Sequence, residues 1–309
     1  MESATATRDA GLVDRYGAEA HPSLLAHVRD YIALTKPRII SLLLVTTVAT
    51  MVVASPEGLA LSTVLWTMLG GYLAAGGAGA INHYLDRDRD ARMARTRSRP
   101  LVSGRIEPLH GLAFGIVLGA LAFVQLAVTV NLLSALLAMA GLLGYVFVYT
   151  MWLKPLTPQN IVIGGAAGAV PPLVGWAAAT GGLTLDALYP FAIVFMWTPP
   201  HFWALSLLIK DDYARTGVPM MPVVRGEEST RRQIVLYAVV LVALTIAPVA
   251  TGLFGSIYLT CALALGGVFL ALAAKLALSP SRRAALRLYL SSLAYLALLF
   301  GAMAADRAL

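Results

Sequence analysis

The 309-residue chain is 59% hydrophobic and only 13% charged, and its mean hydropathy is +0.76. Because a water-soluble domain carries about 25% charged residues, this composition excludes an ordinary soluble protein and indicates a lipid bilayer as the solvent. The net charge of +7 does not require a nucleic-acid partner, since the basic residues flank apolar segments. The single cysteine, Cys261, excludes an intrachain disulfide and a cysteine-based metal site.

Residues 1–34 are predicted to form a cytoplasmic N-terminal tail. They contain acidic residues such as Asp9, Asp14, Glu19 and Asp30 and no long apolar run, so they match neither a secretory signal nor an acid-poor transit peptide. Within the tail, residues 24–31 are expected to form an interfacial helix. The remaining residues, 35–309, are expected to form one intramembrane domain.

Nine apolar segments follow, and each is close to the roughly 20 residues that a spanning helix needs. They cover residues 39–55, 60–82, 110–129, 132–151, 160–178, 186–208, 233–252, 256–277 and 285–304. If the N-terminus is cytoplasmic, every Lys and Arg except Arg307 falls on the cytoplasmic side, as the positive-inside rule requires. The chain is therefore predicted to be an all-α, polytopic membrane helix bundle of about nine transmembrane helices with a cytoplasmic N-terminus. Pro171 and Pro172 are expected to break the fifth helix near its middle.

The first polar cluster lies at the end of the second segment. Asn82, Asp86 and Asp90 are four residues apart, so on a helix their side chains lie on one face. Carboxylate and amide oxygens suit Mg2+, which usually binds one or two carboxylates together with substrate phosphates. This spacing therefore predicts a metal site.

Three arginines, Arg92, Arg95 and Arg99, follow at helical spacing. The planar guanidinium group of arginine matches phosphate oxygens, so carboxylates followed by arginines indicate a site for a metal-bound diphosphate. The alternative is a salt-bridged cytoplasmic loop whose arginines only obey the positive-inside rule.

A second polar cluster closes the sixth segment and contains His201, Lys210, Asp211 and Asp212. It lies on the same cytoplasmic side as the first cluster, so the two clusters are expected to face each other across one cavity. His201 has two interpretations: a packed helical histidine with a satisfied hydrogen bond, or a ligand contact.

These residues resemble the UbiA superfamily of intramembrane prenyltransferases and, within it, the branch that makes haem O. The first motif of the superfamily is an Asn followed by two Asp at four-residue steps, which Asn82, Asp86 and Asp90 match. Segments typical of that branch are 95–101, 157–165, 171–173 and 198–203, and the resemblance extends from residue 35 to the ninth segment. Directly after the first Asn many superfamily members have Asp, whereas this chain has His83. The second motif of those members has two Asp four residues apart. Here Asp212 matches the later Asp, and Leu208 stands in place of the earlier one.

The resemblance implies transfer of the farnesyl group of farnesyl diphosphate to a vinyl group of haem B, with addition of water and release of diphosphate. It implies Mg2+ as cofactor and the lipid bilayer, not nucleic acid, as partner. A downstream haem-modifying enzyme or cytochrome oxidase assembly factors are expected partners. The protein is expected in the cell inner membrane, with its active-site loops on the cytoplasmic side.

The same resemblance implies roles for individual residues. The catalytic set is Asn82, Asp86, Asp90, Arg95 and Arg99, and the metal ligands are Asn82, Asp86, Asp90 and Asp212. The substrate-binding set is Lys36, Arg38, His83, Tyr149, Lys154, His201, Lys210, Asp211 and Asp212. Among these, His83 and His201 are candidate contacts to haem iron or haem propionates.

Two alternatives stay open. An intramembrane prenyltransferase for a quinone or chlorophyll precursor would keep the donor chemistry and change the acceptor; His83, His201 and the shortened second Asp motif argue against it. A cation transporter would also contain carboxylates, prolines within helices and glycine-rich spans. Transporter sites, however, lie near the bilayer midplane, whereas these carboxylates lie at one end of a span.

Overall fold

The computed structural model describes residues 23–309, so most of the predicted tail, including Asp9, Asp14 and Glu19, lies outside the described residues. Within residues 23–309 the chain forms helices and no strand. Nine helices of this part are long and apolar enough to cross a membrane. The predicted all-α class and the predicted number of spans are therefore confirmed.

The spanning helices follow one another along the chain. They are α2 (Pro37–Ala54), α3 (Leu61–Asp90), α4 (Pro108–Thr129), a continuous α5–η1–α6 segment (Leu132–Leu143, Gly144–Leu153 and Lys154–Leu156), α7 (Asn160–Thr180), η2–α8 (Leu185–Ala187 and Leu188–Leu208), α11 (Gly226–Ala250), α12 (Ser256–Leu278) and α13 (Arg282–Ala308). Short helices outside the spans are α1 (Leu24–Thr35), α9 (Lys210–Thr216) and α10 (Met221–Val224). The η1 segment is a π-helix.

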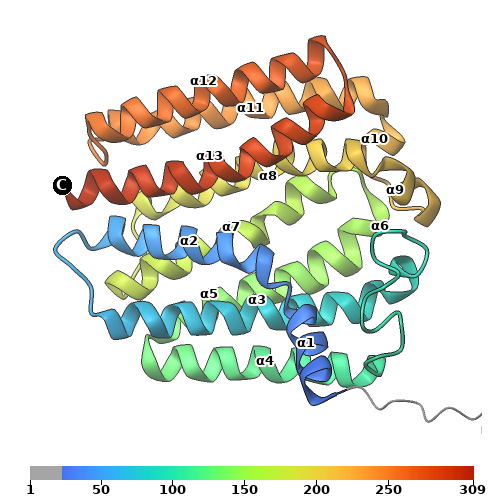
Figure 1. Cartoon of the computed structure of the whole chain (residues 1–309). Coiled ribbons are helices and arrows are strands. Elements are labelled where there is room, and N and C mark those ends of the chain that lie inside the picture. The colour runs from blue at the N-terminus through green and yellow to red at the C-terminus, as the bar shows by residue number, and fades with distance from the viewer. Residues whose placement is uncertain (1–22) are drawn as a thin grey trace, which may run out of the picture.

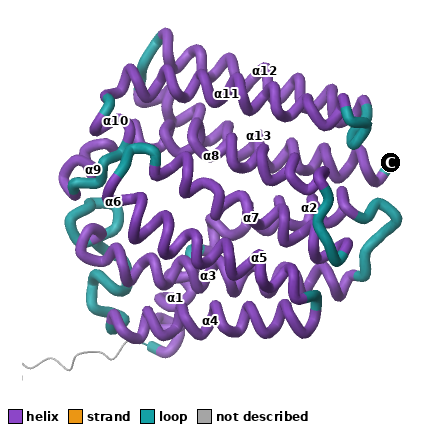
Figure 2. The backbone as a smooth tube through the Cα atoms, turned by 180° about the vertical axis from the view of Figure 1, so that it is seen from behind, coloured by secondary structure: helices purple, strands orange, loops and turns teal. Residues whose placement is uncertain are grey.

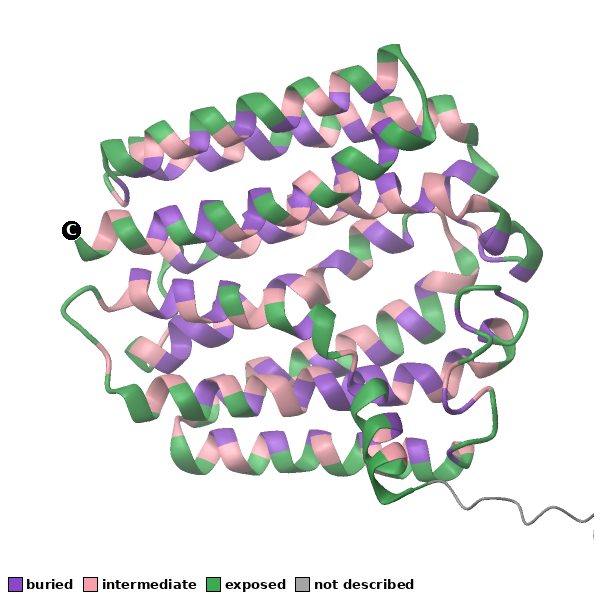
Figure 3. Ribbon diagram, viewed as in Figure 1, coloured by how far each residue is buried: buried purple, intermediate pink, exposed green. Residues whose placement is uncertain are grey.

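The spanning helices run side by side, and the connecting loops gather at the two ends of the bundle (Figure 1). Seen from behind, α6, α9 and α10 lie at one end and the C-terminus at the other (Figure 2). Exposed residues cover the outer sides of the helices (Figure 3), and many are large and apolar, such as Val128, Val268 and Leu298. Helices that are apolar on their outer sides as well as inside are typical of a membrane bundle.

Several spanning helices are longer than their apolar segments, most of all α3 at its C-terminal end and α11 at its N-terminal end. α3 continues past residue 82 to Asp90, and α11 begins at Gly226 and not at 233. Hydropathy detects only the part of a helix that lies in lipid, whereas the helix itself continues into the polar layer. The extension of α3 places the Asn82–Asp90 series on regular helix.

The predicted break at Pro171 and Pro172 is wrong, because α7 is continuous through both prolines. A proline leaves one carbonyl of the preceding turn unpaired, but a spanning helix tolerates it where neighbouring helices pack around the site. Such packing is close here: a Cβ atom on Gly175 of α7 would collide with the carbonyl oxygen of Thr47 in α2.

α1 is longer than the predicted interfacial helix, since it continues to Thr35. It lies across the bundle and not along it (Figure 1). The apolar side chains of Leu24 and Leu25 are exposed, whereas Asp30 is buried and pairs with Arg105 at 2.9 Å. This ion pair ties α1 to the loop of residues 91–107 between α3 and α4.

Candidate active site

The last turns of α3 carry three buried polar side chains on one face. Asn82, Asp86 and Asp90 are spaced four residues apart, and their exposed fractions are 4%, 2% and 5%. A buried carboxylate is costly unless cations and hydrogen-bond donors compensate it. The surrounding side chains supply both.

Asp86 accepts hydrogen bonds from α3 and α6. Its Oδ2 accepts from Lys154 Nζ at 2.5 Å and from Asn82 Nδ2 at 2.8 Å, and its Oδ1 accepts from Arg89 Nη1 at 3.1 Å. Asn82 Nδ2 also donates to Thr150 Oγ1 at 3.2 Å. The carboxylate is therefore held in one orientation by donors on both of its oxygens.

Lys36 stands at the junction of α1 and α2. Its φ of 59° is the only positive φ of a non-glycine residue among residues 23–309, and L residues rarely adopt this left-handed conformation. Its Nζ donates to Asn82 Oδ1 at 2.6 Å and lies 5.9 Å from the centroid of the Tyr145 ring. The unusual backbone thus turns this lysine into the site, whereas Arg38 is exposed on α2.

The charges around Lys36 are close enough to change its ionisation. Burial lowers the pKa of Lys36 to about 7, and repulsion from Arg99 and Lys154 contributes to the lowering, while Asp86 and Asp90 oppose it. A bound anion would relieve this repulsion between cations.

The helical spacing of Arg92, Arg95 and Arg99 predicted that the helix continues through these residues, and this prediction is wrong. α3 ends at Asp90, where the hydroxyl of Thr96 donates to the Asp90 carbonyl at 2.9 Å, and residues 91–107 form a loop of turns. Arg92 and Arg95 are exposed in this loop. Arg99 folds back, and its Nη1 donates to Asp90 Oδ2 at 2.5 Å. We call seven residues the aspartate network: Lys36, Asn82, Asp86, Arg89 and Lys154, which are linked by hydrogen bonds and ion pairs, and the separate Asp90–Arg99 pair one helical turn further on.

The π-helix η1 brings a second set of side chains to the Asp face of α3. π-helical turns use hydrogen bonds between residues five apart and are frequent at functional sites. Thr150 Oγ1 donates to the Tyr145 carbonyl, five residues earlier, at 2.9 Å. The rings of Tyr145 and Tyr149 stack with centroids 5.4 Å apart, and Lys154 follows directly after η1. The resemblance selected Tyr149 and Lys154, whereas Tyr145 and Thr150 were missed.

The second polar cluster reaches the site only in part. Lys210 pairs with Glu227, which raises the pKa of Lys210, and Asp211 is exposed. Asp212 is buried and pairs with Arg215 of the same short helix. The structure therefore does not bring Lys210 or Asp211 to the aspartate network, because α9 turns them outward.

Tyr213, directly after Asp212, connects the second cluster with the first. Its buried side chain belongs to the same apolar cluster as Met93 from the α3–α4 loop and Tyr149 from η1. This cluster therefore joins α9 to the α3–α4 loop and to η1. Tyr213 was missed by sequence reasoning, and its position after two carboxylates was the available signal.

Charges of both clusters act on Tyr213. Burial raises the pKa of Tyr213 to about 12; Asp86 and Asp212 act in the same direction, and Arg95 and Arg99 oppose it. The Tyr213 side chain is therefore within electrostatic range of the aspartate network and of Asp212 together.

The two candidate haem contacts lie in different places. His83 on α3 is 4% exposed, and neither of its ring nitrogens has a hydrogen-bond partner among the described residues. His201 on α8 faces α13, where its Nδ1 lies 2.6 Å from Ser292 Oγ. Its ring is stacked between Trp197 and Tyr289, with centroid distances of 4.2 Å and 4.9 Å. The partner of His201 in the structure is thus the hydroxyl of Ser292.

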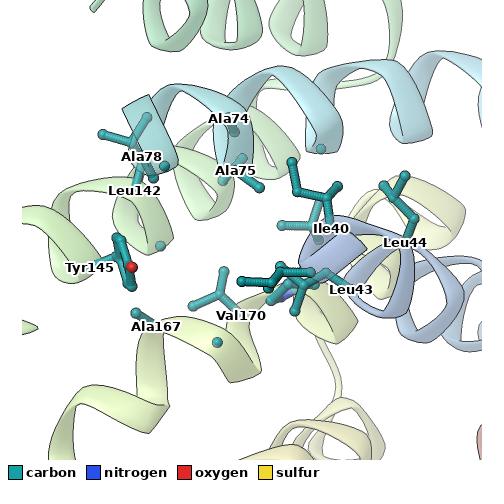
Figure 4. A pocket seen from close by; sticks show the side chains of 18 of the residues that line it. Ile40, Leu43, Leu44, Ala74, Ala75, Ala78, Leu142, Tyr145, Ala167 and Val170 are labelled. Carbon is teal, nitrogen blue, oxygen red and sulfur yellow. The ribbon is translucent and has the colours of Figure 1, made fainter. Parts of the chain in front are cut away.

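An apolar cavity begins beside the aspartate network. It lies between α2, α3, α5, η1 and α7, with Lys36 and Tyr145 at the end nearest the network. Figure 4 shows the side chains that line it, among them Ile40, Leu43, Leu44, Ala74, Ala75, Ala78, Leu142, Tyr145, Ala167 and Val170. A space that is polar at one end and apolar elsewhere fits an amphiphile with an anionic head and a hydrocarbon chain.

The donor set of the site fits Mg2+ that arrives with a phosphate-bearing substrate. Asp86 and Asp90 offer carboxylate oxygens one helical turn apart, and Asn82 offers an amide oxygen, all of which are ligands that Mg2+ prefers. Among residues 23–309 no group of three or more His, Cys, Asp and Glu side chains is placed to hold a metal. A metal ion at this site therefore depends on substrate oxygens to complete its coordination.

The fold and the site together define a membrane helix bundle with a cation-rich carboxylate site beside an apolar cavity. Residues 43–299 match the model of the UbiA prenyltransferase family, and the chain belongs to this family. The chain is 56% identical over 298 residues to the protoheme IX farnesyltransferase of Roseiflexus sp. (strain RS-1), which covers 96% of this chain and 55% of that protein. It is 54% identical over 283 residues to the protoheme IX farnesyltransferase of Symbiobacterium thermophilum, which covers 90% of this chain and 94% of that protein.

The chain thus spans about half the length of the first curated relatives that it matches, such as the Roseiflexus protein. Among solved structures, a UbiA homolog from Archaeoglobus fulgidus bound to GPP and Mg2+ aligns with a TM-score of 0.65 at 17% identity, covering 89% of this chain and 99% of that chain. At this identity the likeness shows the fold alone, and it confirms a multi-pass membrane helix bundle.

Proposed function

We propose that the chain is a Mg2+-dependent prenyltransferase that moves the farnesyl group of farnesyl diphosphate to a vinyl group of haem B and so forms haem O. The observation that carries this proposal is the aspartate network at one end of the apolar cavity, where buried carboxylates and cations adjoin space for a hydrocarbon chain. The names of the two relatives described above support haem B as the acceptor.

The aspartate network would bind the diphosphate. Asn82, Asp86 and Asp90 would hold Mg2+, which supplies positive charge to the diphosphate as it leaves. Lys154 and Arg99 now neutralise the carboxylates, and they would turn to the phosphate oxygens once the substrate binds. Cations placed in advance stabilise the charge that develops when the bond breaks.

The apolar cavity would hold the farnesyl chain. Its walls come from α2, α3, α5, η1 and α7. With the diphosphate bound by the network, the reactive carbon would lie where the cavity meets the aspartate network. The bond between this carbon and the diphosphate oxygen breaks, and the electron pair leaves with the diphosphate. The carbon then bonds to the terminal vinyl carbon of haem B. The inner vinyl carbon becomes positive, takes the oxygen of one water molecule and releases one proton, which completes haem O.

His83 and His201 are the candidate haem contacts. A buried polar group without a partner is costly, and both ring nitrogens of His83 are in that state beside the aspartate network. His201 uses Nδ1 toward Ser292, which leaves Nε2 for haem iron or a propionate.

The remaining proposals concern further residues of the site, the orientation of the protein in the membrane and its protein partners. Asp212 is proposed as a further metal ligand. The exposed Arg38, Arg95 and Asp211 and the half-buried Lys210 are proposed as substrate-attracting groups at the mouth of the site. The distribution of Lys and Arg supports a cytoplasmic N-terminus and cytoplasmic site loops in the cell inner membrane. A downstream haem-modifying enzyme or cytochrome oxidase assembly factors are the proposed protein partners, and nucleic acid is not.

The acceptor is tested with purified protein in nanodiscs, supplied with farnesyl diphosphate, Mg2+ and either haem B or an aromatic quinone precursor. The proposal predicts that haem B is prenylated and that the quinone precursor is not. Prenylation of the quinone precursor in place of haem B would assign the chain to the other acceptor class. Cation flux into vesicles without any diphosphate release would support a transporter instead.

A further inference from the structure

Three tyrosines beside the aspartate network have no role in the transfer described above. Tyr145 and Tyr149 come from η1, and their rings stack with an angle of 28° between the planes. Tyr213 comes from α9 and belongs to the same buried cluster as Tyr149. The three phenols are close enough for each to interact electrostatically with the others. Two elements far apart in sequence thus bring three phenols close together.

The hydroxyl groups of these tyrosines have no protein partner. In the described part of the chain, none of the three oxygens takes part in a hydrogen bond, and none is sealed from a water-sized molecule. Tyr258 shows the usual arrangement, since its buried hydroxyl donates to the Thr245 carbonyl at 2.7 Å. Tyr213 is only 5% exposed, so its unpaired hydroxyl belongs to a largely buried side chain. Unpaired phenols that lie close together can bind a small polar molecule.

The three phenols lie near both the diphosphate site and the apolar cavity. Asp86 lies within electrostatic range of all three phenols, and Tyr145 also lines the cavity, as Figure 4 shows. The apolar cluster to which Tyr213 belongs also includes Met93, Ile161 and Phe202. The phenols therefore lie between the charged groups of the aspartate network and apolar side chains, close to where the farnesyl carbon and the diphosphate oxygen would separate.

The proposed transfer makes two opposite demands on water. Loose water would capture the farnesyl cation and end the reaction as hydrolysis, so the site has to exclude it. One water molecule is nevertheless required later, because the inner vinyl carbon takes its oxygen. A single water held at a fixed place meets both demands, since its position decides which carbon it can reach.

We propose that Tyr145, Tyr149 and Tyr213 hold the water molecule that adds to the haem side chain, an inference that rests on the proposed function. The oxygen of this water forms the new C–O bond with the inner vinyl carbon. One of its protons passes to the departing diphosphate, so no oxidant, reductant or further reactant is needed. The phenols donate and accept hydrogen bonds to the water and are positioning residues.

The proposal is tested by removing each hydroxyl with Tyr→Phe substitutions at 145, 149 and 213, singly and together. Without a positioned water, the cation loses a proton from the neighbouring carbon and gives an alkene that is lighter than haem O by one water. We expect the ratio of alkene to haem O to rise by about five- to tenfold in Tyr213→Phe, because this variant loses one hydrogen bond to the water. The ratio should rise further in the triple variant. In Tyr213→Phe the KM for farnesyl diphosphate should stay unchanged. The products of a single turnover in 18O-labelled water are quantified by mass.

Tyr295→Phe is the matched control. Tyr295 is buried as well, but its ring stacks on Phe269 in another cluster of the bundle, so this variant should keep the wild-type product ratio. Unchanged ratios in the three site variants with an active wild type would overturn the inference. A raised KM for farnesyl diphosphate with an unchanged ratio would assign the phenols to the diphosphate and also overturn it. A wild type that forms no haem product at all would overturn the proposed function itself.

Discussion

Asp86 and Asp90 are each neutralised by a cation from another part of the chain. Lys154 comes from the end of the η1–α6 segment, and Arg99 comes from the α3–α4 loop. Removing one partner of a buried ion pair leaves the other charge without compensation. Substitutions in the aspartate network therefore affect both stability and substrate binding, and each experiment has to separate the two effects.

Arg99→Ala is expected to raise the KM for farnesyl diphosphate by about tenfold, the loss of one charge-assisted hydrogen bond to phosphate. The KM for haem B should stay the same. Arg97→Ala is the matched control, because Arg97 is exposed in the same loop. Steady-state kinetics with each substrate varied in turn provides the measurement. A higher KM for haem B with an unchanged KM for farnesyl diphosphate would contradict the assigned role of Arg99.

The two roles open to His201 diverge when the ring and its partner are changed separately. If His201 contacts haem, His201→Gln should lose haem affinity. Ser292→Ala, which removes only the hydroxyl at 2.6 Å from Nδ1, should keep haem affinity and lose about 1 kcal/mol of stability. Haem titrations and thermal melting of both variants are compared. A titration of the Gln variant that overlays the wild type would leave His201 with a packing role only.

At the scale of whole elements, regular helical geometry determined what the sequence could predict. The fixed period of a helix places Asn82, Asp86 and Asp90 on one face, and hydropathy locates all nine spans. The positions of Tyr145 and Tyr213 depend on a π-helical segment and on the direction in which α9 leaves α8. Neither feature has a signal in local spacing, because both depend on packing between distant segments. For the same reason the arginines after α3 were wrongly placed on a continuing helix.

The close crossing of α2 and α7 carries a prediction of its own. Gly175→Ala is expected to destabilise the protein by about 1–3 kcal/mol, since the added Cβ meets the Thr47 carbonyl oxygen of α2. Gly168→Ala on the same helix is the control, because no atom lies within 4 Å of a Cβ at that position. Thermal melting in detergent compares the two variants. Equal melting temperatures would contradict the close approach of the two helices.

The whole molecule has an asymmetric distribution of charge. Every Lys and Arg except Arg307 belongs to segments that the positive-inside rule assigns to one side of the membrane, and the aspartate network lies at that end of α3. We expect this side to be cytoplasmic, where farnesyl diphosphate, an anionic amphiphile, meets the membrane surface.

The orientation is tested by labelling single cysteines in a Cys261→Ala background. Arg97 lies in the loop after α3 and Thr184 lies in the loop after α7, and both residues are exposed. A membrane-impermeant thiol reagent added outside spheroplasts should label the Thr184→Cys variant. The Arg97→Cys variant should react only after the membrane is opened. The reverse pattern would place the N-terminus and the site on the outside.

The most direct test of the central claim is the turnover of farnesyl diphosphate and haem B by the purified protein in nanodiscs. Haem O and diphosphate are measured together, with Mg2+ or with a chelator, for the wild type and for Asp86→Asn. We predict equal amounts of the two products in the presence of Mg2+ and no product with the chelator. The rate of Asp86→Asn should be about 100- to 1,000-fold lower than that of the wild type, which is the range for removing one group that stabilises developing charge. Wild-type rates in the chelator or in Asp86→Asn would contradict a metal-bound diphosphate at the aspartate network.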